Sequence, residues 1–138
     1  MRITKSYLKT LSYAVNGAAI EVHRTLGPGL LESVYHKCLM HELNLRGINF
    51  VSEMEVPINY KGLSIASDLR CDLFIENILT IELKSVKQLL SINESQILSY
   101  MTLLKSPKGT IFNFNVSNLI KEGHHSYVNK LYKTLPEE

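Results

Sequence analysis

Three charged side chains in the middle of the chain have the types and spacing of a divalent-cation site. Asp72 lies ten residues before Glu82, and Lys84 follows Glu82 by two positions. Carboxylate oxygens are hard ligands that suit Mg²⁺ or Mn²⁺, and these ions keep several waters for a phosphate-bearing substrate. Because side chains alternate along a strand, Glu82 and Lys84 point to the same face if one strand carries both.

The hairpin expected around Asn77 decides whether the two carboxylates meet. A two-residue loop between the strands 70–75 and 79–84 would mix apolar and polar side chains on both faces. A three-residue loop instead places every apolar side chain on one face, namely Cys71, Leu73, Ile75, Leu79, Ile81 and Leu83. Since a slip of one residue moves every side chain to the other face, this pattern selects the three-residue loop. Asn77 then takes the left-handed conformation that such a loop needs.

In this register the second face of the hairpin carries charges. Asp72 faces Glu82, and Arg70 faces Lys84. Two carboxylates directly opposite each other lie about 4.5–5.5 Å apart at Cβ and repel, so either one is protonated or a cation lies between them. The alternative is a solvated polar face on which Lys84 and Arg70 neutralise the acids as surface ion pairs.

Hydrophobic periodicity elsewhere predicts an α/β (α+β) fold in which helices flank a small mixed sheet. We expect helices over 7–26 and 30–46 and a third from Ser91, where Ser91 and Glu94 have capping-box spacing. The expected strands are 56–60, 63–65 after a turn at 61–62, 70–75, 79–84 and 110–116. The weak pattern after residue 117 predicts only a short strand or helix around 127–132. The element order is therefore α-α-β-β-β-β-α-β.

The composition describes one ordinary domain over residues 1–138. The chain is 45% hydrophobic and 20% charged, which excludes disorder, and no apolar run approaches the roughly 18 residues of a membrane helix. A net charge of +2 is too small to indicate nucleic-acid binding by itself. Two cysteines form no disulfide framework and favour a cytoplasmic location. Cys38 and His41, with His36 nearby, lack the second ligand pair that a zinc site needs.

Asp72 followed by Glu82-Leu83-Lys84 resembles the core motif of the PD-(D/E)XK nuclease superfamily. The predicted order of elements is also similar to the restriction-endonuclease-like core of that superfamily. Cys71 stands where the superfamily motif has proline, a difference that affects the strand more than the chemistry.

A second motif makes the resemblance closer. Residues 29–35 read Gly-Leu-Leu-Glu-Ser-Val-Tyr and resemble the GxxExxY signature of a small prokaryotic family within that superfamily, whose members are largely uncharacterised. The likeness extends over about residues 15–116, which is most of the chain.

The resemblance implies a metal-dependent nuclease that hydrolyses phosphodiester bonds of DNA or RNA with Mg²⁺ (or Mn²⁺). Asp72, Glu82 and Glu32 would be the metal ligands. Lys84 would position the attacking water and steady the phosphate, and Gln96 would orient the water or the phosphate. These five residues are the expected catalytic set.

Three further residues are expected to contact the substrate. Arg70 and Lys87 lie near strand ends and loops, where they can meet backbone phosphates, and Tyr100 shares a helix face with Gln96. We expect no appended recognition domain, so specificity would come from a homodimer, a protein partner or loops. Two other interpretations stay open. One is a catalytically silent binding module in a nucleic-acid-processing or defence complex, and the other is a hydrolase of a different phosphorylated substrate, such as a nucleotide.

Overall fold

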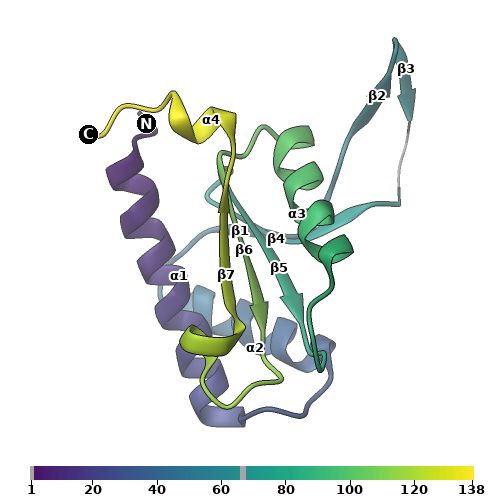
Figure 1. Cartoon of the computed structure of the whole chain (residues 1–138). Helices are drawn as coiled ribbons and strands as arrows, with labels where there is room; N and C mark the ends of the chain where they lie inside the picture. The colour runs from purple at the N-terminus through teal and green to yellow at the C-terminus, as the bar shows by residue number, and fades with distance from the viewer. Residues whose placement is uncertain (1, 66–67) are drawn as a thin grey trace.

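The computed structural model describes residues 2–65 and 68–138, and its first two elements are helices (Figure 1). Helix α1 spans Lys5–Leu26 and begins where the Thr4 side chain accepts the N–H of Tyr7. It ends at Gly27, whose φ of 70° suits a residue without a side chain. Helix α2 spans Glu32–Leu45. Both helices lie within one or two residues of their predicted bounds.

The described residues contain seven strands, and five of them form one mixed sheet in the order β1-β4-β5-β6-β7. The strand bounds are β1 Phe50–Glu55, β2 Ile58–Tyr60, β3 Leu63–Ile65, β4 Arg70–Ile75, β5 Leu79–Lys84, β6 Lys108–Asn113 and β7 His124–Val128. Strands β5 and β6 are parallel and every other neighbouring pair is antiparallel. The parallel pair requires a crossover, which helix α3, Ser91–Leu103, supplies. The predicted mixed sheet is confirmed.

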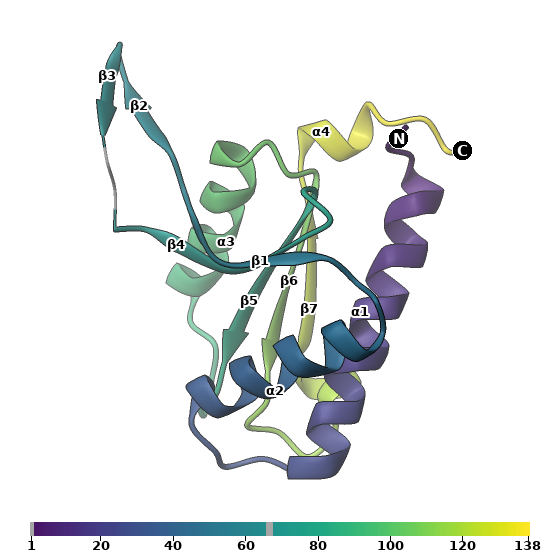
Figure 2. The same ribbon diagram turned by 180° about the vertical axis from the view of Figure 1, so that it is seen from behind.

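Helices cover both faces of this sheet. Helices α1 and α2 pack against the face that carries Leu73 and Ile81. Helix α3 covers the opposite face, where Ile97 and Met101 pack on Ile111 (Figures 1 and 2). Among the described residues, no helix is both long enough and apolar enough to span a membrane.

Strands β2 and β3 form a separate hairpin that extends away from the sheet (Figures 1 and 2). Its turn lies at Lys61–Gly62, as predicted. At the other end of the chain, a π-helical turn, Leu119–Gly123, precedes β7, and helix α4, Lys130–Lys133, follows it. The last residues return to the start of α1, where the N–H groups of Lys5 and Ser6 donate to the carbonyls of Pro136 and Glu137.

Several predicted boundaries were wrong, and strand β1 was missed. β1 is an edge strand with alternating half-buried and exposed residues, so it lacks the apolar signal of a buried strand. Val56 lies buried between β1 and β2 instead of opening a strand. The last predicted strand ends earlier, at Asn113, and the tail contains both a strand and a helix. The Asn93 side chain, not Ser91, caps α3 by accepting the N–H of Leu90.

The paired strands β1 and β4 change faces partway along their length. Ser52 pairs with Leu73, and Leu73 packs under α1 and α2, but Met54 pairs with Cys71, and both pack with Tyr100 of α3. The prediction that Cys71 and Leu73 share a face was therefore wrong, although both are fully buried. The change occurs at Asp72 and Glu53, which lie between the pairs Ser52–Leu73 and Met54–Cys71, and Glu53 has a positive φ of 55°.

Candidate metal centre

Strands β4 and β5 separate between residues 70–72 and residues 82–84, and we call this opening the fork. The carboxylates of Asp72 and Glu82 lie in it. The hairpin has the predicted register, with Leu73 opposite Ile81 as its last pair. Beyond that pair, hydrogen bonds from backbone N–H groups to side-chain carboxylates take the place of backbone–backbone hydrogen bonds between the strands. The Asp72 N–H donates to Oε1 of Glu82 at 3.1 Å, and the Leu83 N–H donates to Oδ2 of Asp72 at 2.7 Å. The predicted approach of Asp72 to Glu82 is confirmed, in a fork instead of a regular ladder.

Burial makes this pair of acids electrostatically costly. Glu82 is 5% exposed. Desolvation, and after it the charge of Asp72, raise the pKa of Glu82 to about 9, against the opposing effects of the Asp72 N–H and Lys84. Without a cation, burial beside Asp72 therefore favours the protonated form of Glu82. This is one of the two outcomes that the opposed carboxylates predicted.

Glu32, Lys84 and Tyr100 lie around the fork. Desolvation raises the pKa of Glu32, and the charge of Asp72 adds to this while Lys84 opposes it. Desolvation also raises the pKa of the buried Tyr100, with Glu82 as the next cause. Side chains from α2, β4, β5 and α3 therefore share one electrostatic environment.

The other predicted residues lie farther out. Arg70 begins β4 opposite Glu55 of β1, and its guanidinium donates to the Leu69 carbonyl. The predicted pairing of Arg70 with Lys84 was wrong, because the residues of β4 that precede Leu73 follow β1 and do not pair with β5. Gln96 is half-buried on α3, one turn before Tyr100, and Lys87 is exposed in the loop between β5 and α3.

Hydrogen bonds hold the backbone around Lys84. The Lys84 carbonyl accepts the N–H of Phe114 at 2.9 Å. The buried Asn113 amide then binds both backbone groups of Val86, donating to its carbonyl at 2.9 Å and accepting its N–H at 3.1 Å. The Ser85 hydroxyl donates to the Leu30 carbonyl, just before α2. The end of β5 is thus tied to β6 and to the start of the helix that carries Glu32.

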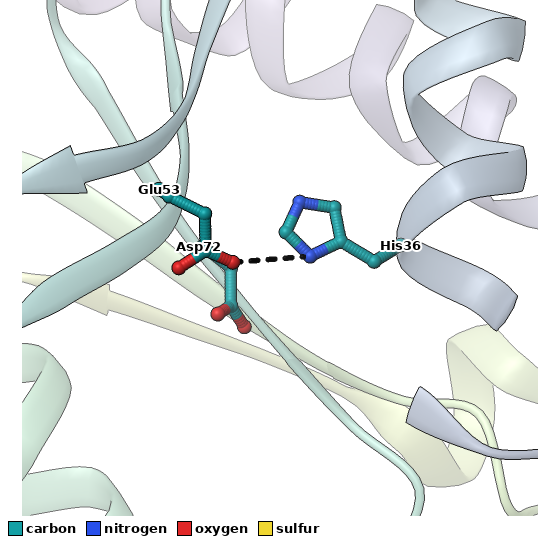
Figure 3. Close-up of side chains that lie close together, drawn as sticks. All are labelled: His36, Glu53 and Asp72. Carbon is teal, nitrogen blue, oxygen red and sulfur yellow. Dashed lines mark ion pairs between the residues drawn. The ribbon is translucent and has the colours of Figure 1, made fainter. Parts of the chain in front are cut away.

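Two residues that the sequence prediction missed also reach the fork. His36 of α2, Glu53 of β1 and Asp72 of β4 each offer one ligand atom, and these atoms lie within 4.8 Å of one another (Figure 3). Within residues 2–65 and 68–138 this is the one such group of histidine, cysteine or acidic residues. A signal for His36 existed, since it follows Glu32 by four and so shares its helix face. Glu53 had none, because its strand was not predicted.

The chain matches a family model described as the PD-(D/E)XK nuclease superfamily over residues 9–126. The chain belongs to this superfamily. The match covers both motifs and every expected site residue, and the mixed sheet with flanking helices is consistent with the restriction-endonuclease-like fold. No curated protein and no solved structure gave a significant match to the chain. Members of a nuclease superfamily of this kind use divalent metals, and the acids in the fork supply oxygen donors that suit one.

Proposed function

We propose that this chain is a divalent-metal-dependent nuclease that hydrolyses phosphodiester bonds of DNA or RNA. The observation that carries the proposal is the fork between β4 and β5, where the buried Glu82 carboxyl lies against Asp72 and the charge of Asp72 adds to the rise in the pKa of Glu82. A fold gains no stability from burying two acids against each other, so a cation offers the physical reason for the arrangement. Membership of the PD-(D/E)XK superfamily supports the same conclusion.

We propose that Asp72 and Glu82 hold the ion and that Glu32 approaches them from the first turn of α2 when the ion binds, because the ligand atoms of these three acids do not all lie within 4.8 Å of one another before then. Oxygen donors of this kind fit Mg²⁺, with Mn²⁺ as a substitute. The Leu83 N–H orients the Asp72 carboxylate through its 2.7 Å hydrogen bond, so one acid is already fixed in place. The proton on Glu82 must leave when the ion binds, so binding of the ion releases a proton.

Different residues of the chain then have different roles in hydrolysis of the phosphodiester. A bound divalent ion lowers the pKa of its water and neutralises charge that develops on the phosphate. Lys84, held by the backbone bonds on either side, places one compact positive charge beside a phosphate oxygen. Gln96 orients the water or the phosphate from α3. Arg70 and Lys87 contact the nucleic-acid backbone around the fork, and Tyr100 is the third proposed substrate contact.

We further infer that the chain belongs to the GxxExxY branch of the superfamily. Gly29 has a positive φ of 94°, which suits the glycine of the signature. The Tyr35 hydroxyl donates to the Gly27 carbonyl and accepts the N–H of Leu30, and its ring stacks on Phe114 at 4.5 Å between ring centroids. The signature tyrosine therefore holds the turn from which Glu32 is presented.

Cleavage of labelled single- and double-stranded DNA and RNA tests this function. With Mg²⁺ or Mn²⁺ the wild-type chain is expected to cut at least one of the four substrates, and EDTA should stop the reaction. Lys84→Met removes the charge and keeps the length, so we expect the rate to fall by roughly 10³-fold, as for other groups that stabilise a transition-state charge.

Lys133→Met is the matched control, because Lys133 is exposed on α4, at the other end of the sheet from the end of β5 (Figure 1). It should cut at the wild-type rate. Substrate binding without cleavage, in wild type and both variants, would overturn the proposal in favour of a silent binding module. Hydrolysis of nucleotides alone would overturn it in favour of a small phosphorylated substrate.

A further inference from the structure

His36 faces two carboxylates from the helix side: Asp72 of the fork and Glu53 of the neighbouring strand β1. Its Nδ1 lies 3.7 Å from Oε1 of Glu53, and the Asp72 carboxylate completes the group (Figure 3). The His36 side chain is 13% exposed, whereas that of Glu53 is 58% exposed. The group therefore opens to solvent on the Glu53 side, which gives an ion a way in.

The second nitrogen of His36 has its own partner. Nε2 lies 3.0 Å from the hydroxyl oxygen of Ser52. When Nε2 carries the ring proton and donates it to Ser52, the lone pair of Nδ1 points at the carboxylates. Histidines that bind metals are held in this way, because a hydrogen bond on one nitrogen leaves the other free to coordinate. Ser52 and Glu53 are adjacent, so one stretch of β1 both orients the imidazole and adds a carboxylate.

Asp72 belongs to this group and to the fork at the same time. It contacts Glu82 and Leu83 through the bonds described above, and its carboxylate also lies within 4.8 Å of the His36 and Glu53 ligand atoms. Glu82, on the other side of Asp72 from this group, is buried and only 5% exposed. A carboxylate has two oxygens and can bridge two ions, so one acid can serve both ligand sets.

We propose that His36, Glu53 and Asp72 form a second divalent-metal site beside the Asp72–Glu82 pair, and that this site takes a transition ion such as Mn²⁺ in preference to Mg²⁺. The preference follows from the ligands, because imidazole nitrogen suits transition ions whereas Mg²⁺ favours oxygen donors. The inference rests on the proposed function in one respect: the first ion, held by Asp72 and Glu82, is part of that function. The second site is argued from His36, Glu53 and Asp72 alone. It assigns to His36 a role outside the GxxExxY signature.

Binding of Mn²⁺ and Mg²⁺ to the full chain, without nucleic acid, tests this site. Isothermal titration gives the number of ions and their affinities, and electron spin echo envelope modulation detects nitrogen bound directly to Mn²⁺. The variants are His36→Gln and Glu53→Gln, which remove one ligand each at nearly constant size. His41→Gln is the matched control, because His41 is exposed on the same helix and lies outside the group. Circular dichroism of each variant checks that it is folded.

Wild type and His41→Gln are expected to bind two Mn²⁺ ions, one with a nitrogen signal. His36→Gln should lose that signal and weaken this Mn²⁺ site by roughly 10–100-fold while changing Mg²⁺ binding less than about twofold. Mn²⁺ binding without a nitrogen signal, or unchanged in His36→Gln, would overturn the inference and leave His36 as an ion-pair partner of Glu53.

Cleavage assays on the same samples separate this inference from the proposed function. A nitrogen signal in a protein that cuts no nucleic acid supports the second site and contradicts the nuclease. Cleavage that needs Lys84 but shows no nitrogen signal supports the nuclease and contradicts the second site. A protein that binds neither ion contradicts both.

Discussion

Residues 73–75 of β4 pair with β5 along a continuous ladder, whereas residues 70–72 of the same strand lie beyond its last pair. Residues 73–75 are apolar: Leu73 and Ile75 lie under α1 and α2, and Phe74 packs with Tyr100 of α3 on the other face. Residues 70–72 follow β1, and there the Asp72 side chain accepts a backbone N–H of β5 that a regular ladder would satisfy with a carbonyl. In β4, residues 73–75 thus stabilise the fold, whereas residues 70–72 present the carboxylate of Asp72.

The difference shows how a small sheet makes room for a site. A regular antiparallel ladder satisfies its own backbone groups and leaves no space between the strands for a side chain. Where β4 separates from β5, the freed N–H groups of Asp72 and Leu83 need acceptors, and the two carboxylates supply them. The acids are therefore held by the same bonds that satisfy the backbone.

The largest expected effect on stability comes from the paired half. Leu73→Ala removes a fully buried side chain and should lower the free energy of unfolding by about 2–5 kcal/mol. Asp72→Asn keeps an oxygen that can accept the Leu83 N–H and removes a charge beside Glu82, so we expect a change below about 1 kcal/mol. Urea denaturation in EDTA measures both. An Asp72→Asn loss as large as that of Leu73→Ala would show that the fork is a stabilising element.

A smaller effect is expected from pH in the metal-free protein. The pKa of Glu82 is raised from 4.5 to about 9, so the folded state holds a proton that the unfolded chain releases over this range. The contribution of Glu82 to stability is therefore fully present below pH 4.5 and is lost as pH rises toward 9. Between pH 6 and 8 we expect a loss of roughly 2–3 kcal/mol in urea denaturation. Glu82→Gln cannot titrate and should flatten the profile; a wild-type profile as flat as the variant's would contradict the shift.

The smallest effect concerns the backbone of β1 opposite the fork. At Glu53 the positive φ of 55° strains any residue with a side chain, so Glu53→Gly should be more stable than Glu53→Ala by about 1 kcal/mol. At Glu55, two residues on, the order should reverse by about 0.5–1 kcal/mol, because glycine loses more conformational freedom in a strand. Thermal melts of the four variants decide this, and the same order at both positions would refute the strain at Glu53.

Much of the fold follows from local patterns in the chain. The bounds of β4 and β5 and the register of their hairpin follow from alternation, because a slip by one residue would expose the apolar face. Asn77 has the predicted left-handed conformation, with a φ of 59°. The first two helices follow from their apolar stripes. Strand β1 could not be found in this way, because an edge strand with polar residues on both faces has no clear period.

The approach of Asp72 to Glu82 follows from chain connectivity and alternation, because both residues lie in one hairpin. The separation of the strands there, the turn of Cys71 toward α3 and the approach of His36 and Glu53 to Asp72 depend instead on how distant elements pack. The two kinds of contact differ in range. A hairpin register depends on neighbouring residues, whereas the group at Asp72 joins a helix, an edge strand and a change of face, which depend on packing across the whole sheet.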